Sequence, residues 1–169
     1  MRREFTGMKV MGAIGGPVVF ITGAHNGQRG IMTLNMLAGV TFAPPQVCIS
    51  LSQHSHTRSL IEPSGEFAVN VISPEQMELA KLIGRTTGRR VDKFKQFNVE
   101  TFEGRIVQCP LVKVAYTVLE CTVVNSLDLG NHVLYVGEVV AYHEPREGSP
   151  LYLYHGHYYT IGEQIGSYK

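Results

Sequence analysis

The sequence predicts a mainly β protein: a split β-barrel, antiparallel and Greek-key-like in order, with a few short helices. Runs of β-branched and aromatic residues recur along the chain, and short turns separate most of them. Helical patterns are too few to place a helix between successive strands, as a doubly wound sheet would require. The 169 residues contain no repeat and no long linker, so we expect one domain over residues 1–169.

The first half of the chain contains the clearest hairpin signal. The run PVVFITGAH (17–25) is apolar and β-branched, Asn26-Gly27 follows it, and RGIMTL (29–34) returns. Asn-Gly is the dipeptide that tight two-residue hairpins prefer. Two further strands are predicted on either side of Pro44-Pro45, VTF (40–42) and QVCISL (46–51).

The second half combines two helices with long strands. RSLIE (58–62) predicts a short helix that ends at Pro63 and Gly65. SPEQMELAKLIG (73–84) predicts a second helix, which Ser73 caps and Gly84 ends. The predicted strands are EFAVNVI (66–72), VKVAYTVLECTVVNSLDL (112–129) and HVLYVGEVVAYH (132–143), before an aromatic segment, PLYLYHGHYYTIG (150–162).

Composition excludes several classes of protein. A net charge of +1 leaves no general electrostatic footprint for nucleic acid. The N-terminal MRREFTGMKVMGAIGG has only a short, glycine-broken apolar stretch, which predicts neither a signal peptide nor a membrane-spanning helix. Cys48, Cys109 and Cys121 are odd in number and lack CxxC spacing. We therefore expect a cytoplasmic protein with reduced cysteines.

The stretch SQHSHTRSLI (52–61) has three interpretations. As a metal site it would use His54 and His56, which are one residue apart, as are His155 and His157. Metal sites usually need three or four ligands with supporting carboxylates, and none accompanies either pair. We therefore expect no metal here, and the role of the histidine pairs stays open.

As an anion site, the same stretch would use Ser55, His56 and Thr57 where a helix begins, with Arg58 adding charge. A helix N-terminus presents free N–H groups that suit a phosphate. Hydroxyl residues at a helix start are also ordinary caps. The stretch alone leaves both interpretations open.

The wider sequence resembles the flavin reductase-like, FMN-binding split-barrel family, and its flavoredoxin branch most closely. The resemblance runs over residues 8 to 163 and depends on the order of several segments rather than on one motif. These segments are RGIMTLNMLAGVTFAPPQVCISLSQHSHTRSLIEPSGEFAVNVIS (29–73), GRRVDKFKQF (88–97), GNHVLYVGEVV (130–140) and LYLYHGHYYTIGE (151–163).

The resemblance implies a set of flavin-binding residues. The flavin phosphate would lie at Ser55, His56 and Thr57, and Lys93 of the VDKF segment would reach it. The remaining implied contacts are the strand end at Thr33, Leu34, Asn35 and Met36 along the isoalloxazine, and Ser50 with Leu51 beside the ribityl chain. Two positions depart from the family: Gly30 replaces a common Asn, and Met36 replaces an aromatic residue.

The resemblance also implies a function. We expect an NAD(P)H-dependent flavin or ferric reductase, in which hydride passes from the nicotinamide to N5 of FMN, rather than FAD. His132, which follows Gly130-Asn131, would lie near the nicotinamide, although an idle turn histidine is the alternative. We expect a homodimer with the flavin near the interface, and oxygen, free flavin, ferric iron or a protein as acceptor.

Two other functional classes remain. A flavoredoxin-like carrier would hold FMN tightly and pass electrons between protein partners without nicotinamide turnover. A split barrel could also bind haem or pyridoxal phosphate, because fold does not fix function. Thr33, Thr57 and Lys93 occurring together argue against that third class.

Overall fold

The computed structural model describes residues 7–168. Both arginines of the N-terminal segment considered above lie outside the described residues. The helices are α1 (Gly7–Gly12), α2 (His56–Ser64), the 3₁₀ turn η1 (Pro74–Gln76), α3 (Met77–Arg85) and α4 (Lys93–Gln96). No helix within residues 7–168 is long and apolar enough to cross a bilayer.

Seven antiparallel strands form the main sheet, in the order β3-β2-β6-β9-β10-β5-β4. They are β2 (Val19–His25), β3 (Gln28–Leu34), β4 (Leu37–Phe42), β5 (Pro45–Ser52), β6 (Glu66–Val71), β9 (Thr117–Asp128) and β10 (His132–His143). Smaller sheets are made of β1 (Gly16–Pro17), β11 (Tyr152–Tyr154) and β12 (His157–Tyr159), and of β7 (Thr101–Phe102) and β8 (Leu111–Val112). The prediction of a mainly β, antiparallel fold with a few short helices is confirmed.

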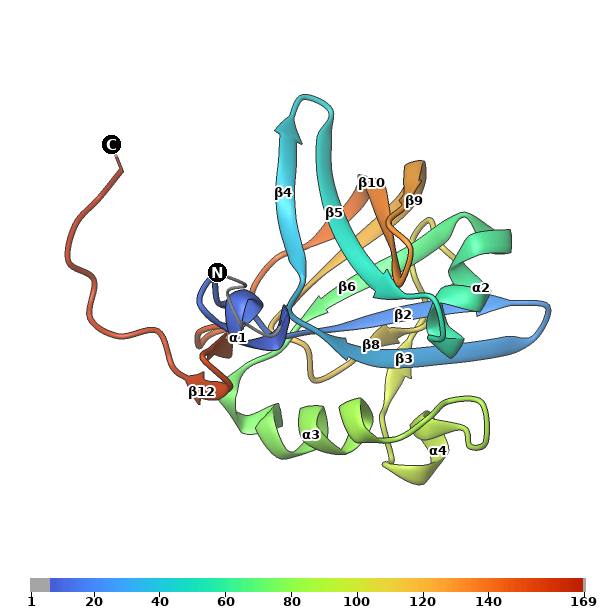
Figure 1. The fold of residues 1–169 in the computed structure, drawn as a ribbon, viewed down its shortest axis with the longest axis horizontal. Helices are drawn as coiled ribbons and strands as arrows, with labels where there is room; N and C mark the ends of the chain where they lie inside the picture. The colour runs from blue at the N-terminus through green and yellow to red at the C-terminus, as the bar shows by residue number, and fades with distance from the viewer. Residues whose placement is uncertain (1–6, 169) are drawn as a thin grey trace, which may run out of the picture.

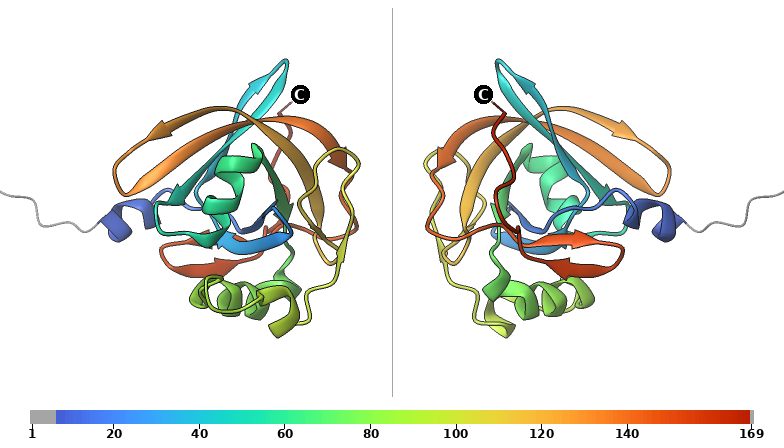
Figure 2. Two further views of the ribbon diagram at one scale, coloured as in Figure 1. Left: turned by 90° about the vertical axis from the view of Figure 1, so that its right-hand side faces the viewer. Right: turned by 90° about the vertical axis from the view of Figure 1, so that its left-hand side faces the viewer.

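The connection between β3 and β4 explains why the sheet curls into a barrel. These two strands are the opposite edges of the sheet, yet only Asn35 and Met36 separate them in the chain. So short a link can join opposite edges only if the sheet rolls round and brings them together. Figure 2 shows the curled sheet, with α2 lying against its open side.

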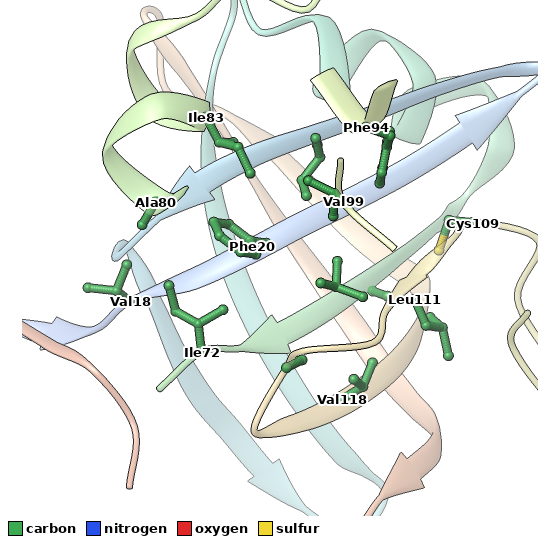
Figure 3. Close-up of a cluster of buried hydrophobic side chains, with 14 of the residues drawn as sticks. Val18, Phe20, Ile72, Ala80, Ile83, Phe94, Val99, Cys109, Leu111 and Val118 are labelled. Atoms are coloured by element: carbon green, nitrogen blue, oxygen red, sulfur yellow. The ribbon is translucent and has the colours of Figure 1, made fainter. Parts of the chain in front are cut away.

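Strands β2 and β6 bury both of their faces, which divides the core into two clusters. In β2, Val19 and Ile21 point into the barrel, where Ile61 of α2 joins them. Phe20 points the other way and packs with Ile83 of α3, as Figure 3 shows. Because successive side chains of a strand point to opposite faces of the sheet, β2 contacts α2 on the inner face and α3 on the outer face.

The predicted hairpin at Asn26-Gly27 is confirmed, with φ of 48° and 76° at its two turn residues. Several predicted boundaries were wrong. The helix expected over 58–62 runs from His56 through Pro63 to Ser64, and the strand expected over 40–42 begins at Leu37. The helix expected to end at Gly84 continues to Arg85, and its backbone at Gly84 lies close to Thr33, where an added Cβ would be 3.5 Å away. The strand expected over 112–129 begins only at Thr117, because Val112 pairs with β7 instead.

Candidate functional site

A pair of glycines seats helix α2 on the sheet. Gly23 of β2 and Gly30 of β3 are direct cross-strand partners. A Cβ on Gly23 would lie 2.7 Å from Ile61 Cγ1, and one on Gly30 would lie 3.0 Å from Thr57 Oγ1. Glycine inside a strand often marks close approach of other backbone, and here it lets the start of α2 rest on β3. Gly30 therefore has a packing reason for departing from the asparagine expected at this position.

The N-terminus of α2 is open. Ser55 caps it, and its Oγ accepts the Arg58 N–H at 3.3 Å and lies 3.1 Å from Met32 Sδ. The N–H groups of His56 and Thr57 have no acceptor among residues 7–168. Thr57 is only 2% exposed, so Ser55 and His56 are the more accessible of the three predicted phosphate residues.

Lys93 brings a buried amine to this region. The residue is 7% exposed, and its Nζ donates to the carbonyl of Ile83, near the end of α3, at 2.7 Å. Burial lowers the pKa of the Lys93 amine from 10.5 to about 8. At pH 7 the amine is still charged and has no carboxylate partner in the described chain. A buried charge without a counter-ion is costly and suits a site for an anionic ligand.

His56 lies in the same electrostatic environment. Burial lowers the pKa of its imidazole, and the positive charges of Arg89 and Lys93 lower it further. Gly88 lets the 88–93 segment approach closely, since an added Cβ there would lie 2.9 Å from His56 Cδ2. Two cations, a neutral imidazole and two free N–H groups therefore converge at the start of α2. These groups fit a flavin phosphate, which carries nearly two negative charges.

Arg58 already has partners on its own helix and in the barrel. Its guanidinium forms an ion pair with Glu62 and donates to Tyr135 Oη at 3.3 Å. Arg89 lies nearer, and it donates to the carbonyl of His54 at 3.4 Å. The Glu62 side chain is 59% exposed, so its pair with Arg58 is weak, and a contribution of Arg58 to the anion site stays a prediction.

Residues 33–36 lie at the seam of the barrel, which is the place where the two edges of the rolled sheet, β3 and β4, are joined. Asn35 and Met36 belong to neither ladder, and Met36 is 38% exposed. Thr33 Oγ1 donates to the carbonyl of Ala80 at 2.7 Å, so its side chain ties β3 to α3. Leu34 is buried in the barrel core, which leaves only its backbone to meet a ligand.

The other predicted residues flank the seam. Ser50 donates its N–H to the carbonyl of Met36 at 3.0 Å and is buried, whereas the Leu51 side chain lies wholly inside the barrel. His132 is the cross-strand partner of Ser52, and its Nδ1 lies 3.0 Å from Asn131 Oδ1. The β9–β10 turn thus lies beside residues 52–57, and His132 is half-exposed there.

The two histidine pairs are not arranged as strand chelates. His54 lies in a turn before α2, and His155 occupies a turn position with φ of 48° between β11 and β12. Within residues 7–168 no three His, Cys, Asp or Glu side chains are grouped to hold a metal. A cleft of about 980 Å³ lies between the β2–β3 turn and residues 101–110, and its lining contains none of the predicted site residues.

The sequence did not predict a role for Gly23, Gly88 or Met32. These residues shape the site through their packing and are not predicted to contact the ligand. A glycine in each strand of the first hairpin was the available signal for the close approach of α2. Gly88 and Met32 carried no such signal, because their roles depend on contacts between segments far apart in the chain.

The flavin reductase-like domain model matches residues 11–162, and the chain belongs to this family. The predicted family is therefore confirmed. A ferric-chelate reductase (NAD(P)H) from Archaeoglobus fulgidus is 31% identical over 71% of this chain and 70% of its own. The NADH-dependent FMN reductase AsuE2 of Streptomyces nodosus subsp. asukaensis is 29% identical over 95% of this chain and 85% of its own.

Solved structures agree on the fold. Flavoredoxin from Methanosarcina acetivorans superposes with a TM-score of 0.87, covering 99% of this chain and 95% of that one, at 23% identity. At this identity the likeness establishes the fold, and the site must be argued from the residues of this chain.

Proposed function

We propose that the protein is an NAD(P)H-dependent reductase that binds FMN at the start of α2. The observation that carries this proposal is the buried amine of Lys93 beside the open N-terminus of α2. Membership of the flavin reductase-like family and the names of its relatives support the redox function. The cations lie around a site for one phosphate group, which favours FMN over FAD.

When bound, FMN supplies the redox chemistry, accepting hydride from the nicotinamide and passing electrons to an acceptor. The protein contributes position and charge. Ser55, His56 and Lys93 would hold the phosphate, and the backbone N–H groups of Asn35 and Met36, free of both ladders, would be available to stabilise negative charge on the ring. His132 orients the nicotinamide from the β9–β10 turn. Ser50 holds the seam in place, because its backbone N–H donates to the carbonyl of Met36.

Two measurements test this proposal. Titration of the purified protein with FMN, followed by flavin fluorescence, should show saturable binding. Stopped-flow mixing of the FMN-loaded protein with NADH or NADPH should then bleach the flavin band rapidly. A band that bleaches with dithionite but with neither nicotinamide would favour an electron carrier, and absence of FMN binding would refute the flavin site itself.

We also propose a homodimer with the flavin near its interface. Strand β4 supports this, because it is an edge strand whose residues are exposed on both faces, with Phe42 100% exposed at its end. Figure 1 shows β4 and β5 projecting from the barrel as an arm. A long, exposed apolar edge invites pairing with another chain. Analytical ultracentrifugation of the wild type and of Phe42→Asp would test it: a dimer weakened by the substitution is expected, and a monomeric wild type would refute it.

A cytoplasmic location is part of the same proposal. Its support is that Cys48, Cys109 and Cys121 are all free thiols. Burial raises the pKa of Cys109 to about 12, which keeps that thiol protonated and unreactive.

A further inference from the structure

A second cleft, of about 640 Å³, lies between α3 and the β11–β12 hairpin. Figure 1 shows β12 beside the first turns of α3. Lys81 and Arg85 line the cleft from α3, His157 and Tyr158 line it from the hairpin, and no carboxylate lines it. The two cations of the cleft therefore lie on one wall, helix α3, and face His157 and Tyr158 on the other.

Arg85 is the side chain best placed to bind an incoming anion. It lies in the last turn of α3, it is exposed, and it has no hydrogen-bond or ion-pair partner among residues 7–168. Its guanidinium can bind a phosphate through two parallel N–H bonds. An arginine left free at the mouth of a cleft without acids is available for a ligand.

Lys81 adds a second charge. Its Nζ forms an ion pair with Glu78 at 2.6 Å and lies 5.6 Å from the centre of the Tyr158 ring. The Glu78 side chain is 72% exposed, so this pair is weak and the amine can turn to a stronger anion. Lys81 and Arg85 are four residues apart on α3 and so share one wall of the cleft, which Tyr158 faces from the hairpin.

Thr33 connects this cleft to the flavin site. Its side chain lines the cleft and donates to the carbonyl of Ala80, whereas its backbone begins the segment 33–36 that we place along the flavin ring. A molecule that reacts at the flavin could therefore extend one end into the cleft. Nicotinamide dinucleotides have this form, with the reactive ring at one end and phosphates remote from it.

We propose that the α3–β12 cleft binds a phosphate group of the nicotinamide dinucleotide, with Arg85 as its main ligand and Lys81 and His157 in support. This inference rests on the proposed reductase function and deepens it. An arginine suits the 2′-phosphate of NADPH, whereas a carboxylate suits the free ribose hydroxyl of NADH. The absence of acids from the cleft lining therefore assigns NADPH as the preferred donor.

Steady-state reduction with three donors tests this assignment: NADPH, NADH and the uncharged 1-benzyl-1,4-dihydronicotinamide. Arg85→Ala should raise the KM for NADPH by roughly tenfold to a hundredfold, as expected for loss of a charge-assisted bond, with little change in kcat. Arg85→Lys should recover part of the loss. Arg105→Ala removes another exposed arginine that does not line the cleft and should leave all three donors unchanged.

The pattern across donors identifies the phosphate. A raised KM for NADPH alone places the 2′-phosphate in the cleft, and a raised KM for both dinucleotides places the pyrophosphate there. The proposal is overturned if neither dinucleotide responds, or if the uncharged donor loses as much as they do.

A binding experiment separates this proposal from the proposed function. If FMN binds but no donor reduces it, the reductase function is refuted while the cleft can still be tested. Calorimetric titration with adenosine 2′,5′-bisphosphate and with ADP should show binding that Arg85→Ala weakens at least tenfold. If neither compound binds, or if both bind equally well to Arg85→Ala, the phosphate site does not exist.

Discussion

Replacing Lys93 by methionine should make the flavin-free protein more stable and its FMN binding weaker. The amine is 7% exposed, and its pKa falls from 10.5 to about 8 because of burial. That fall corresponds to about 3 kcal/mol against the charged folded state. Methionine removes this cost but also the bond to the Ile83 carbonyl, which contributes about 1.5–3 kcal/mol. The expected net gain is about 1 kcal/mol, or roughly 2–4 °C in Tm.

The difference in stability between Lys93→Met and the wild type should depend on pH. Because the folded pKa of Lys93 lies below its unfolded value, the folded state binds fewer protons between pH 8 and 10.5, and wild-type stability gains from rising pH in that range. The advantage of Lys93→Met should therefore be full below about pH 8, shrink as the pH rises, and become a deficit by about pH 10.5, where only the loss of the bond to Ile83 remains. Thermal unfolding without flavin, scanned from pH 6.5 upward, measures it.

FMN affinity should change in the opposite direction. Loss of the charge-assisted bond to the phosphate should weaken binding by about 1.5–3 kcal/mol at pH 7. Lys95→Met, which removes an exposed lysine from the same short helix, should change neither stability nor affinity appreciably. A Lys93→Met protein that is no more stable than wild type at pH 7, and binds FMN equally well, would refute both the buried-charge argument and the phosphate site.

Three further substitutions test other parts of the structure. Gly30→Asn should destabilise the protein by about 1–3 kcal/mol in urea unfolding, because its Cβ would lie only 3.0 Å from Thr57. Gly39→Asn is the control and should cost far less, because a Cβ at Gly39 meets nothing within 4 Å. Glu120→Gln should cost about 2–4 kcal/mol at pH 7 and flatten the acid limb of the stability curve; equal acid sensitivity of both proteins would contradict this. His132→Ala should raise the nicotinamide KM and leave FMN affinity intact; if neither changes, the histidine is an idle turn residue.

The prediction for Glu120 rests on a buried carboxylate that pins the 105–107 segment. The residue is 0% exposed, and it accepts three backbone N–H groups and the Nε2 of His143. Burial alone would raise its pKa, but these hydrogen bonds outweigh burial and hold the pKa at about 2. Because the folded value is depressed, the stabilisation is present above pH 4.5 and is lost as pH falls toward 2.

Most of the fold could be predicted because its signals are local. Asn26-Gly27 favours a tight hairpin turn, and the β-branched and aromatic run over residues 17–25 predicts a strand, although it does not define where the strand ends. The errors at Gly84 and Thr117 are errors of boundary. At Thr117 the cause is a distant partner, because Val112 pairs with Thr101 of β7.

The candidate site was predictable only in part. The phosphate residues around His56 and the lysine of the VDKF segment came from the order of motifs, and the structure brings His56 and Lys93 together. The charge environment was not predictable from the order of the chain, because the pairing of Arg58 with Glu62 and the bond of Arg89 to the His54 carbonyl depend on the folded structure. Which arginine is free depends on an ion pair within one helix and on the path of a loop thirty residues away.

The link of two residues between Leu34 and Leu37 has a consequence for how the molecule tolerates change. Lengthening it by even a few residues would let the rolled sheet relax outward and would part the segments on either side of the join. Insertions should be borne easily at the projecting tip near Phe42 and poorly at this link. The number of residues at one covalent joint is thus as much a determinant of the architecture as the apolar pattern of the strands.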